Sequence, residues 1–155
     1  MIYLAQVVIK DISSLTKIFD IRVSRALTMT QNQIYAAIQK SLSEYYHEPV
    51  FSGSSNPRQY DRLYKLLNSI VKTKITRAGD TFCCSVEVND EYLGYKYPGG
   101  ATGREVWEWA NANTHGGTVE GNLKVWDNAI SNLGGEQGII NIMRENLIRC
   151  GVPTL

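Results

Sequence analysis

A cysteine and a histidine are the first residues to consider for catalysis, because a thiol activated by an imidazole can act as a nucleophile. Cys150 lies beside Leu147 at the end of an apolar helical pattern, where cysteine behaves as a small hydrophobic side chain. His115 lies where a helix is expected to end, and the helix dipole favours histidine there. No signature of a thiol enzyme surrounds either residue, so both are interpreted as structural.

The sequence also lacks the patterns typical of metal or cofactor sites. Its two histidines, His47 and His115, are far apart, and its three cysteines include no Cys-x-x-Cys pair. Glu105 and Glu108 are three positions apart on an expected helix, where a solvated face explains them better than an acid-base pair. We therefore expect no catalytic residue, no metal and no cofactor, and we do not expect an enzyme.

Residues 99–103, Gly-Gly-Ala-Thr-Gly, precede an expected helix and resemble an anion-binding helix start. They lack the Gly-Lys-Ser/Thr ending of a nucleotide-binding loop, and Tyr97-Pro98 precedes them in place of a buried strand. A hinge or contact loop is the preferred interpretation.

Residues 57–70 lie between a long amphipathic helix and a hairpin and are interpreted as a docking segment. Residues 58–77 carry six basic residues and one acidic residue, a net charge of +5, whereas residues 80–91 have a net charge of −4. This basic stretch could bind nucleic-acid phosphates, form the charged face of a sheet, or line a pore that DNA passes through. The candidate DNA-facing or sheet-face residues are Arg58, Arg62, Lys65, Lys72 and Lys74.

Five aromatic residues gather in a glycine-rich loop and the helix after it. They either form a contact surface for another subunit or partner, where such side chains are enriched, or pack as a satellite cluster under the loop. These candidate interface residues are Tyr92, Tyr95, Tyr97, Trp107 and Trp109.

The bulk composition is that of a globular protein. The chain has 155 residues, 43% of them hydrophobic and 20% charged, and is interpreted as a single domain over residues 1–155. No apolar run approaches the ~20 residues that span a bilayer, and residues 1–9 lack the basic leader and cleavage site of a signal peptide. An odd number of cysteines argues against a disulfide framework and favours a reducing, intracellular setting.

The N-terminal half predicts a strand and then a long helix. Residues 2–9 favour a strand because they are rich in β-branched and aromatic residues. Apolar residues at three- and four-residue steps predict a helix over residues 14–47, about 50 Å long, with residues 28–30 as its weak point. A short helix is expected over residues 60–68. The apolar stripe of the long helix comprises Leu15, Ile18, Phe19, Arg22, Ala26, Met29, Gln33, Ile34, Ala37, Ile38, Leu42 and Tyr45.

The apolar period then changes to two, which predicts a hairpin closed by residues 78–81. Val71, Thr73 and Ile75 would share one face of its first strand. The register that sets Arg77 opposite Phe82 predicts these further pairs: Ile75 with Cys84, Val71 with Val88, and Lys72 with Glu87.

The C-terminal part predicts helices. Thr102 and Glu105 have the spacing of a capping box, which predicts a helix start that residues 115–117 would end. Residues 118–134 predict a short helix or a strand and turn. A last helix is expected over residues 136–150, with Ile139, Ile140, Met143, Leu147 and Ile148 inward. The order indicates an α+β fold, with a long N-terminal helix and C-terminal helices packed on a small antiparallel β-sheet.

Residues 62–70, Arg-Leu-Tyr-Lys-Leu-Leu-Asn-Ser-Ile, resemble a short motif of the neck or tail-completion proteins of long-tailed double-stranded DNA phages. These proteins are also described as head–tail connector or minor capsid proteins. Leu66, Ser69 and Ile70 match the motif, whereas Leu63 replaces its usual threonine. Residues 115–117 resemble a segment of relatives from prophages of Gram-positive hosts, and the resemblance spans about residues 11–151.

The resemblance implies a structural virion protein without catalysis or cofactor. Its copies would form a ring, usually a hexamer, in the phage neck, joining the head connector to the tail tube. They would assemble in the host cytoplasm and contact adjacent neck and tail-tube proteins, while DNA only passes through the channel and no membrane is involved. The alternative, from another class, is a nucleic-acid-binding accessory protein that uses residues 58–77.

Overall fold

The computed structural model describes residues 12–47, 65–112 and 124–154. The strand expected over residues 2–9, most of the short helix expected over residues 60–68, and residues 115–117 lie outside these ranges.

The described part combines helices with short antiparallel strands, which confirms the α+β fold class. The helices are α1 (Ile12–His47), the 3-10 helix η2 (Leu67–Ser69), α2 (Asp90–Leu93), α3 (Gly103–Ala112), α4 (Val125–Asn132) and α5 (Gly135–Arg149). The strands are β1 (Ile70–Lys72), β2 (Thr76–Ala78), β3 (Thr81–Cys83) and β4 (Val86–Val88).

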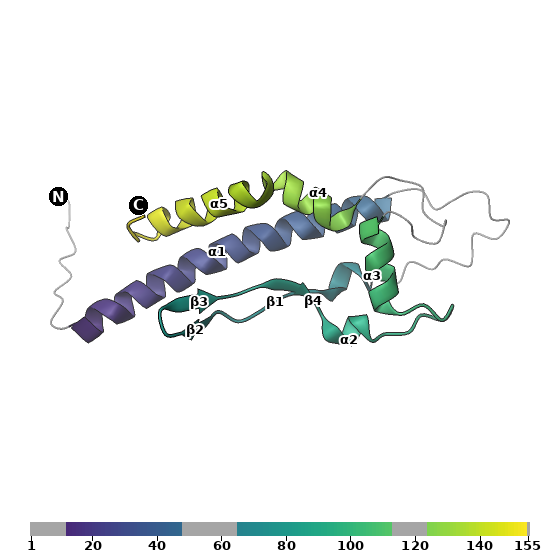
Figure 1. The fold of residues 1–155 in the computed structure, drawn as a ribbon, viewed down its shortest axis with the longest axis horizontal. Coiled ribbons are helices and arrows are strands. Elements are labelled where there is room, and N and C mark those ends of the chain that lie inside the picture. Colours follow the sequence, from purple (N-terminus) through teal and green to yellow (C-terminus); the bar gives the residue numbers. More distant parts are fainter. Residues whose placement is uncertain (1–11, 48–64, 113–123, 155) are drawn as a thin grey trace, which may run out of the picture.

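The long helix α1 is the axis of the molecule. Figure 1 shows α4 and α5 along one side of α1 and the β-ribbon along another, with α2 and α3 at the far end of the ribbon. The C-terminal helices therefore pack mainly on α1, and α1 packs on the strands. The N-terminal turns of α1 project beyond both the ribbon and α5 (Figure 1).

Helix α1 runs without a break through residues 28–30, the weak point expected from the sequence. The hydroxyls of Thr28 and Thr30 donate to the carbonyl oxygens of Ser24 and Ala26 at 2.9 and 3.0 Å. Because these hydroxyls find acceptors one turn back in the same helix, they are compatible with an uninterrupted helix.

The buried face of α1 agrees with the predicted stripe only in part. Ala26, Ile38 and Leu42 are fully buried, as predicted. Leu15 and Phe19 are 49% and 46% exposed, so their predicted place in the core is wrong. The reason is that they lie on the N-terminal turns, which have no layer packed over them.

The main core lies at the end of the molecule where α1 meets η2, β1, α2, α3 and α4. At this end of the molecule α4, η2 and β1 all pack on α1. Its buried members are Ile38, Leu42, Leu66, Ile70, Tyr92, Val106, Ala110, Val125 and Ala129.

The tip of the hairpin has the predicted register. Strands β2 and β3 pair with Arg77 opposite Phe82, and Gly79 has a φ of 61° in the two-residue turn. A positive φ is the conformation that this turn class requires and that glycine adopts without strain.

The base of the hairpin has a different register from the one predicted. In the β1–β4 ladder Val71 faces Glu87 and Lys72 faces Val86, so the predicted pairs Val71–Val88 and Lys72–Glu87 are wrong. Three residues, 73–75, separate β1 from β2, whereas two residues, 84–85, separate β3 from β4. The extra residue is a β-bulge, and the predicted Ile75–Cys84 pair falls inside it.

The bulge also changes which side chains of β1 face α1, because a slip of one residue exchanges the two faces of a strand. Lys72 turns toward α1, where its Nζ lies 2.8 Å from Oδ1 of Asn32 and 5.0 Å from the ring centroid of Tyr35. Ile70 is buried on the same side, and Val71 is on the opposite face. The prediction that Val71 shares the inner face is therefore wrong.

The predicted capping box is present at the start of α3. The backbone N–H of Thr102 donates to Oε2 of Glu105 at 2.7 Å, and the N–H of Glu105 donates to the Thr102 hydroxyl at 3.2 Å. Both hydrogen bonds satisfy backbone N–H groups that have no partner within the first turn of a helix. The ambiguous segment after α3 contains the helix α4.

Helix α5 has the predicted extent but a different inward face. It ends at Gly151, which has a φ of 73°, and the N–H of Val152 donates to the carbonyl of Leu147 at 2.9 Å. Ile140 and Ile148 are 44% and 58% exposed, so their predicted inward orientation is wrong. The buried Asn146 occupies the face toward α1, and Ile140 and Ile148 lie to the side of that face.

Candidate functional site

The tyrosines of the predicted contact loop are largely packed against one another. Tyr92 is buried, and its hydroxyl lies 3.1 Å from the hydroxyl of Tyr97. The rings of Tyr95 and Tyr97 meet edge to face with centroids 5.1 Å apart. Partial burial raises the pKa of the Tyr97 phenol. The loop is therefore an ordered part of the fold, and Tyr92 has little surface left for a partner.

The tryptophans of α3 also contact the core. Trp107 meets Trp126 of α4 edge to face at 5.9 Å between ring centroids, and Trp107 and Trp109 pack half-buried against the core. The packed-cluster alternative accounts for these contacts. A partner contact through the remaining exposed surface of Tyr95, Tyr97, Trp107 and Trp109 stays a prediction.

The predicted basic residues do not form one described surface. Lys65 places its Nζ 4.0 Å from the ring centroid of Tyr95, and Lys72 is held by α1 as described above. Lys74 is exposed at the bulge. Arg58 and Arg62 lie outside the described residues.

The residues first considered for chemistry have structural explanations. Cys150 is half-buried, with its Sγ 3.9 Å from Sδ of Met29, which fits its reading as a small apolar side chain. Glu105 caps α3, and residues 99–103 belong to a loop closed by the hydrogen bond from Tyr97 N–H to Ala101 at 2.7 Å. Within the described ranges, no group of three or more His, Cys, Asp or Glu side chains could hold a metal ion.

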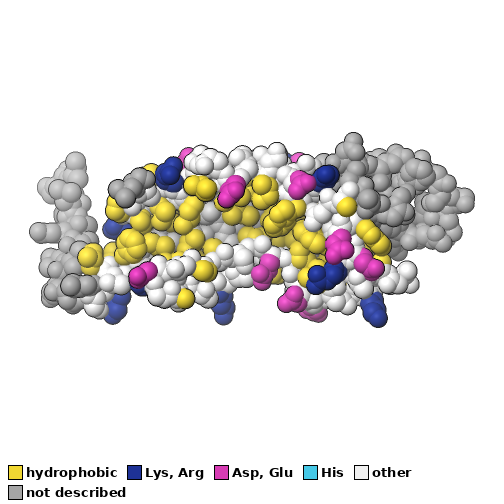
Figure 2. Space-filling view, viewed as in Figure 1, with side chains coloured by type: hydrophobic (Ala, Val, Ile, Leu, Met, Phe, Trp, Pro, Cys, Tyr) yellow, Lys and Arg dark blue, Asp and Glu magenta, His cyan; other side chains and the backbone are white. Residues whose placement is uncertain are grey.

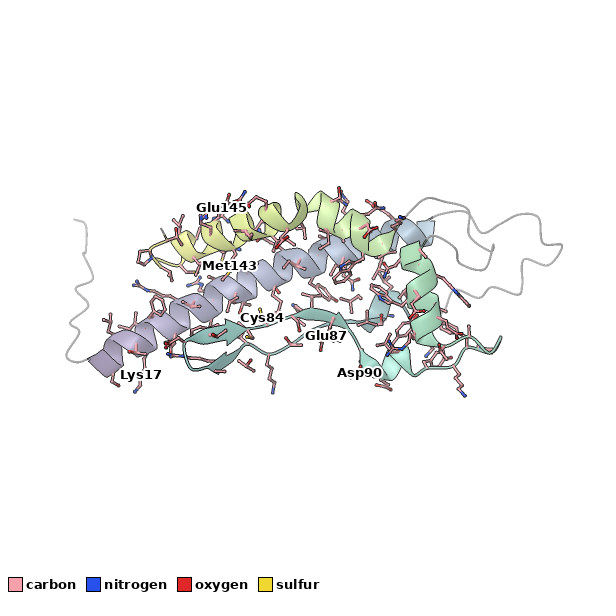
Figure 3. The ribbon with its side chains drawn as sticks, viewed as in Figure 1. Lys17, Cys84, Glu87, Asp90, Met143 and Glu145 are labelled. Carbon is pink, nitrogen blue, oxygen red and sulfur yellow. The ribbon has the colours of Figure 1, made fainter. Side chains whose placement is uncertain are left out.

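An apolar groove is the surface feature that the sequence did not predict. It has a volume of about 350 Å³, with α1 as its floor, α5 as one wall and the stretch from Cys84 to Val86 as the other. Figure 2 shows a band of hydrophobic side chains along this face, and Figure 3 places Cys84 and Met143 on the two walls. The lining residues are Leu27, Thr30, Gln31, Ile34, Cys84, Ser85, Val86, Ile139, Ile140 and Met143.

Two other observations describe this face. Burial, with a smaller contribution from neighbouring Cys83, raises the pKa of the Cys84 thiol, which disfavours the reactive thiolate. Leu27 was not part of the apolar stripe predicted for α1. It lies seven residues before Ile34, and this helical spacing could have identified it. No pattern in the sequence indicated that the two walls would be far enough apart to leave the groove open.

The projecting end of α1 carries further apolar surface. Leu15 and Phe19 are about half exposed and Ile21 is 68% exposed. Exposed large apolar side chains that gather on one element are typical of contact sites. Leu15 and Phe19 are four residues apart and share one face of α1, whereas Ile21 lies on another face. Leu15 and Phe19, called the projecting patch below, and the groove are the described surfaces best suited to bind another protein.

The chain matches the model of a known protein family. The model of the YomN family matches residues 11–149, which is most of the chain. The chain belongs to the YomN family. The family is phage-derived, which confirms the phage association implied by the resemblance.

Two other comparisons found nothing. No curated protein and no solved structure matches this YomN-family chain. Of the helices described here, none is both long enough and apolar enough to cross a membrane.

Proposed function

We propose that this YomN-family protein is a structural virion component whose copies assemble into a ring in the phage neck and join the head connector to the tail tube. The observation that carries the proposal is the projecting patch, where Leu15 and Phe19 are 49% and 46% exposed on N-terminal turns of α1 that extend past the other described elements. A phage-derived family and a helix that extends past its own fold both support an assembly role.

The projecting patch can contribute to association. Full burial of a Leu or Phe side chain contributes about 1.5–3 kcal/mol, so two half-exposed side chains supply roughly that amount when a partner covers them. The projecting patch and the groove are different surfaces of one chain. A contact between different surfaces is heterologous, and copies joined in this way close into a ring when the rotation permits.

Nucleic-acid binding is the second candidate and has less support. Lys65 and Lys72 are engaged by Tyr95 and by α1, so two of the three described basic residues already have contacts within the chain. Salt-dependent DNA binding by the isolated monomer would favour this alternative, since phosphate contacts weaken steeply with salt.

The location can be tested on phage particles. An antibody against the protein, labelled with gold, should mark the junction of head and tail in electron micrographs of purified particles, and capsids and tails separated from one another should show which side retains it. Label spread over the capsid, or absence of the protein from purified particles, would contradict the proposal.

A further inference from the structure

We propose that the apolar groove binds residues 2–9 of a second copy as an added β-strand. The inference rests on the proposed assembly and names one contact between neighbouring copies. It combines a strand edge at Val86 of β4, a groove lined by uncharged residues, and the apolar residues 2–9 that precede α1.

The groove offers a free strand edge. The N–H of Thr73 donates to Ser85 at 3.0 Å, and the N–H of Asn89 donates to Ser69 at 2.8 Å. Because hydrogen bonding alternates along an antiparallel strand, the N–H and C=O of Val86 point away from β1. Figure 1 shows β3 on the side of the ribbon nearer to α5, so this edge faces the groove. Such an edge is a template for an added strand.

The chemistry of residues 2–9 matches this groove. Their sequence is Ile-Tyr-Leu-Ala-Gln-Val-Val-Ile, so both alternating faces of an extended segment are apolar except at Gln6. Strands that are apolar on both faces are typically buried on both faces. None of the ten described lining residues of the groove is charged, and Ile140 on its wall is 44% exposed. An uncharged strand would cover this surface without burying a charge.

Distances along the chain favour a second copy over the same copy. At 1.5 Å per residue, Leu27 and Ile34 on the groove floor lie about 22 and 33 Å along α1 from Ile12. At ~3.4 Å per residue, residues 7–9 of a chain that folds back stay within about 17 Å of Ile12. The apolar Val7, Val8 and Ile9 therefore cannot reach the floor of their own groove. The same residues of a neighbouring copy have no such restriction.

Two single-cysteine chains test this contact. The first carries Val8→Cys with Cys83→Ser, Cys84→Ser and Cys150→Ala, and the second keeps Cys84 as its only cysteine. Mixed and mildly oxidised, they should form a disulfide-linked heterodimer. The matched control keeps Cys83 in place of Cys84, since Cys83 is the adjacent residue, lies at the end of β3 and does not line the groove. We expect at least fivefold more linkage to Cys84 than to Cys83.

Other outcomes overturn the inference. Equal linkage to both cysteines, or none to Cys84, means that residues 2–9 do not occupy the groove of another copy. A chain that carries both Val8→Cys and Cys84 and closes a loop within itself would assign the groove to its own segment. Circular dichroism confirms that the variants are folded.

A second measurement does not depend on disulfide geometry. Hydrogen exchange at the amide of Val86 should slow at least tenfold when the unmodified protein associates, and Val8→Asp should abolish that protection. Light scattering of the unmodified protein separates the two proposals. Assembly without linkage or protection removes only the groove contact, whereas a protein that never assembles removes the proposed ring.

Discussion

The side-chain amide of Gln31 donates a 2.7 Å hydrogen bond to the backbone carbonyl of Ser85, beside the bulge of the hairpin. The same nitrogen donates to the carbonyl of Thr73 at 2.9 Å, so one buried side chain of α1 bonds both strands at the point where their register changes. A bulge leaves backbone groups without ladder partners. Gln31 supplies a donor to the Thr73 carbonyl and a further donor to the Ser85 carbonyl, which also accepts from the N–H of Thr73. This contact places one wall of the apolar groove against α1.

Replacing Gln31 with leucine should destabilise the fold. The substitution keeps an apolar stem of similar size but removes both donors, and partly unsatisfied buried carbonyls cost about 1–3 kcal/mol. Urea unfolding followed by circular dichroism measures the loss. Gln137→Leu on the exposed side of α5 is the matched control and should change stability by less than about 0.5 kcal/mol. Equal effects from both substitutions would contradict the role of Gln31.

Asn146 should have a similar effect at the contact between α5 and α1. It is 1% exposed, and its amide nitrogen donates to the Thr30 hydroxyl at 3.0 Å and to Oε1 of Gln33 at 2.9 Å. Asn146→Leu should lower the free energy of unfolding by about 1–3 kcal/mol because it removes these bonds inside the interface. Asn141→Leu, on the exposed side of the same helix, is the control. An unchanged urea midpoint for Asn146→Leu would show that apolar packing alone holds α5.

The capping box should make the start of α3 sensitive to acid. Hydrogen bonds from the backbone N–H and then the hydroxyl of Thr102 hold the pKa of Glu105 below its usual value. The stabilisation is therefore fully present above the ordinary glutamate pKa of about 4.3 and is lost as the pH falls through the lowered pKa. Glu105→Gln should weaken this acid dependence in thermal melts between about pH 6 and pH 3.

Two variants complete the test of the capping box. Glu108→Gln removes a carboxylate from the same helix without touching the cap, so it should retain the acid dependence of the unmodified protein. Thr102→Ala should cost about 1 kcal/mol, as is typical for loss of an N-cap side chain. If Glu105→Gln and Glu108→Gln give the same pH profile, the cap is not the source of the acid dependence.

The junction of α2 and α3 should not tolerate a side chain at Gly103. A Cβ at this position would collide with the backbone carbonyl of Tyr92, and backbone cannot move aside as a flexible side chain can. Gly103→Ala should therefore destabilise the protein by about 1–3 kcal/mol, as overpacking does. Gly99→Ala in the same loop meets nothing within 4 Å and is the control. A neutral Gly103→Ala would place α3 farther from α2 than described.

Local signals in the sequence were sufficient for most of the fold. The capping box of Thr102 and Glu105, the turn at Gly79 and the helical spacing of α1 and α5 each depend on residues close in the chain. Their chemistry selects one backbone conformation without reference to the rest of the molecule. For that reason α1, α5, the start of α3 and the tip of the hairpin were predicted correctly.

The errors have a different physical origin. The bulge depends on Gln31, more than forty residues before Ser85 in sequence, and no period within the hairpin reveals a donor on another element. The exposed Ile140 and Ile148 follow from the same cause, because the polar Asn146 occupies the inward position of α5. Sequence periodicity assigns such positions to apolar residues, so a buried polar contact shifts the face.

The groove could not be predicted because it is a property of spacing between layers. Leu27, Ile139 and Val86 all have the pattern of core residues, and each does face the space between α5 and the ribbon. Whether that space is filled depends on how far apart the two walls stand on α1. Periodicity carries no information on this distance.

The central claim is that copies of this chain associate through apolar surface, and light scattering coupled to size-exclusion chromatography tests it most directly. We expect a concentration-dependent oligomer of defined mass, which Phe19→Ser in the projecting patch weakens at least tenfold. Lys17→Ser on the same exposed turns should leave the mass unchanged. A folded monomer at every concentration, or equal behaviour of the two variants, would contradict the account.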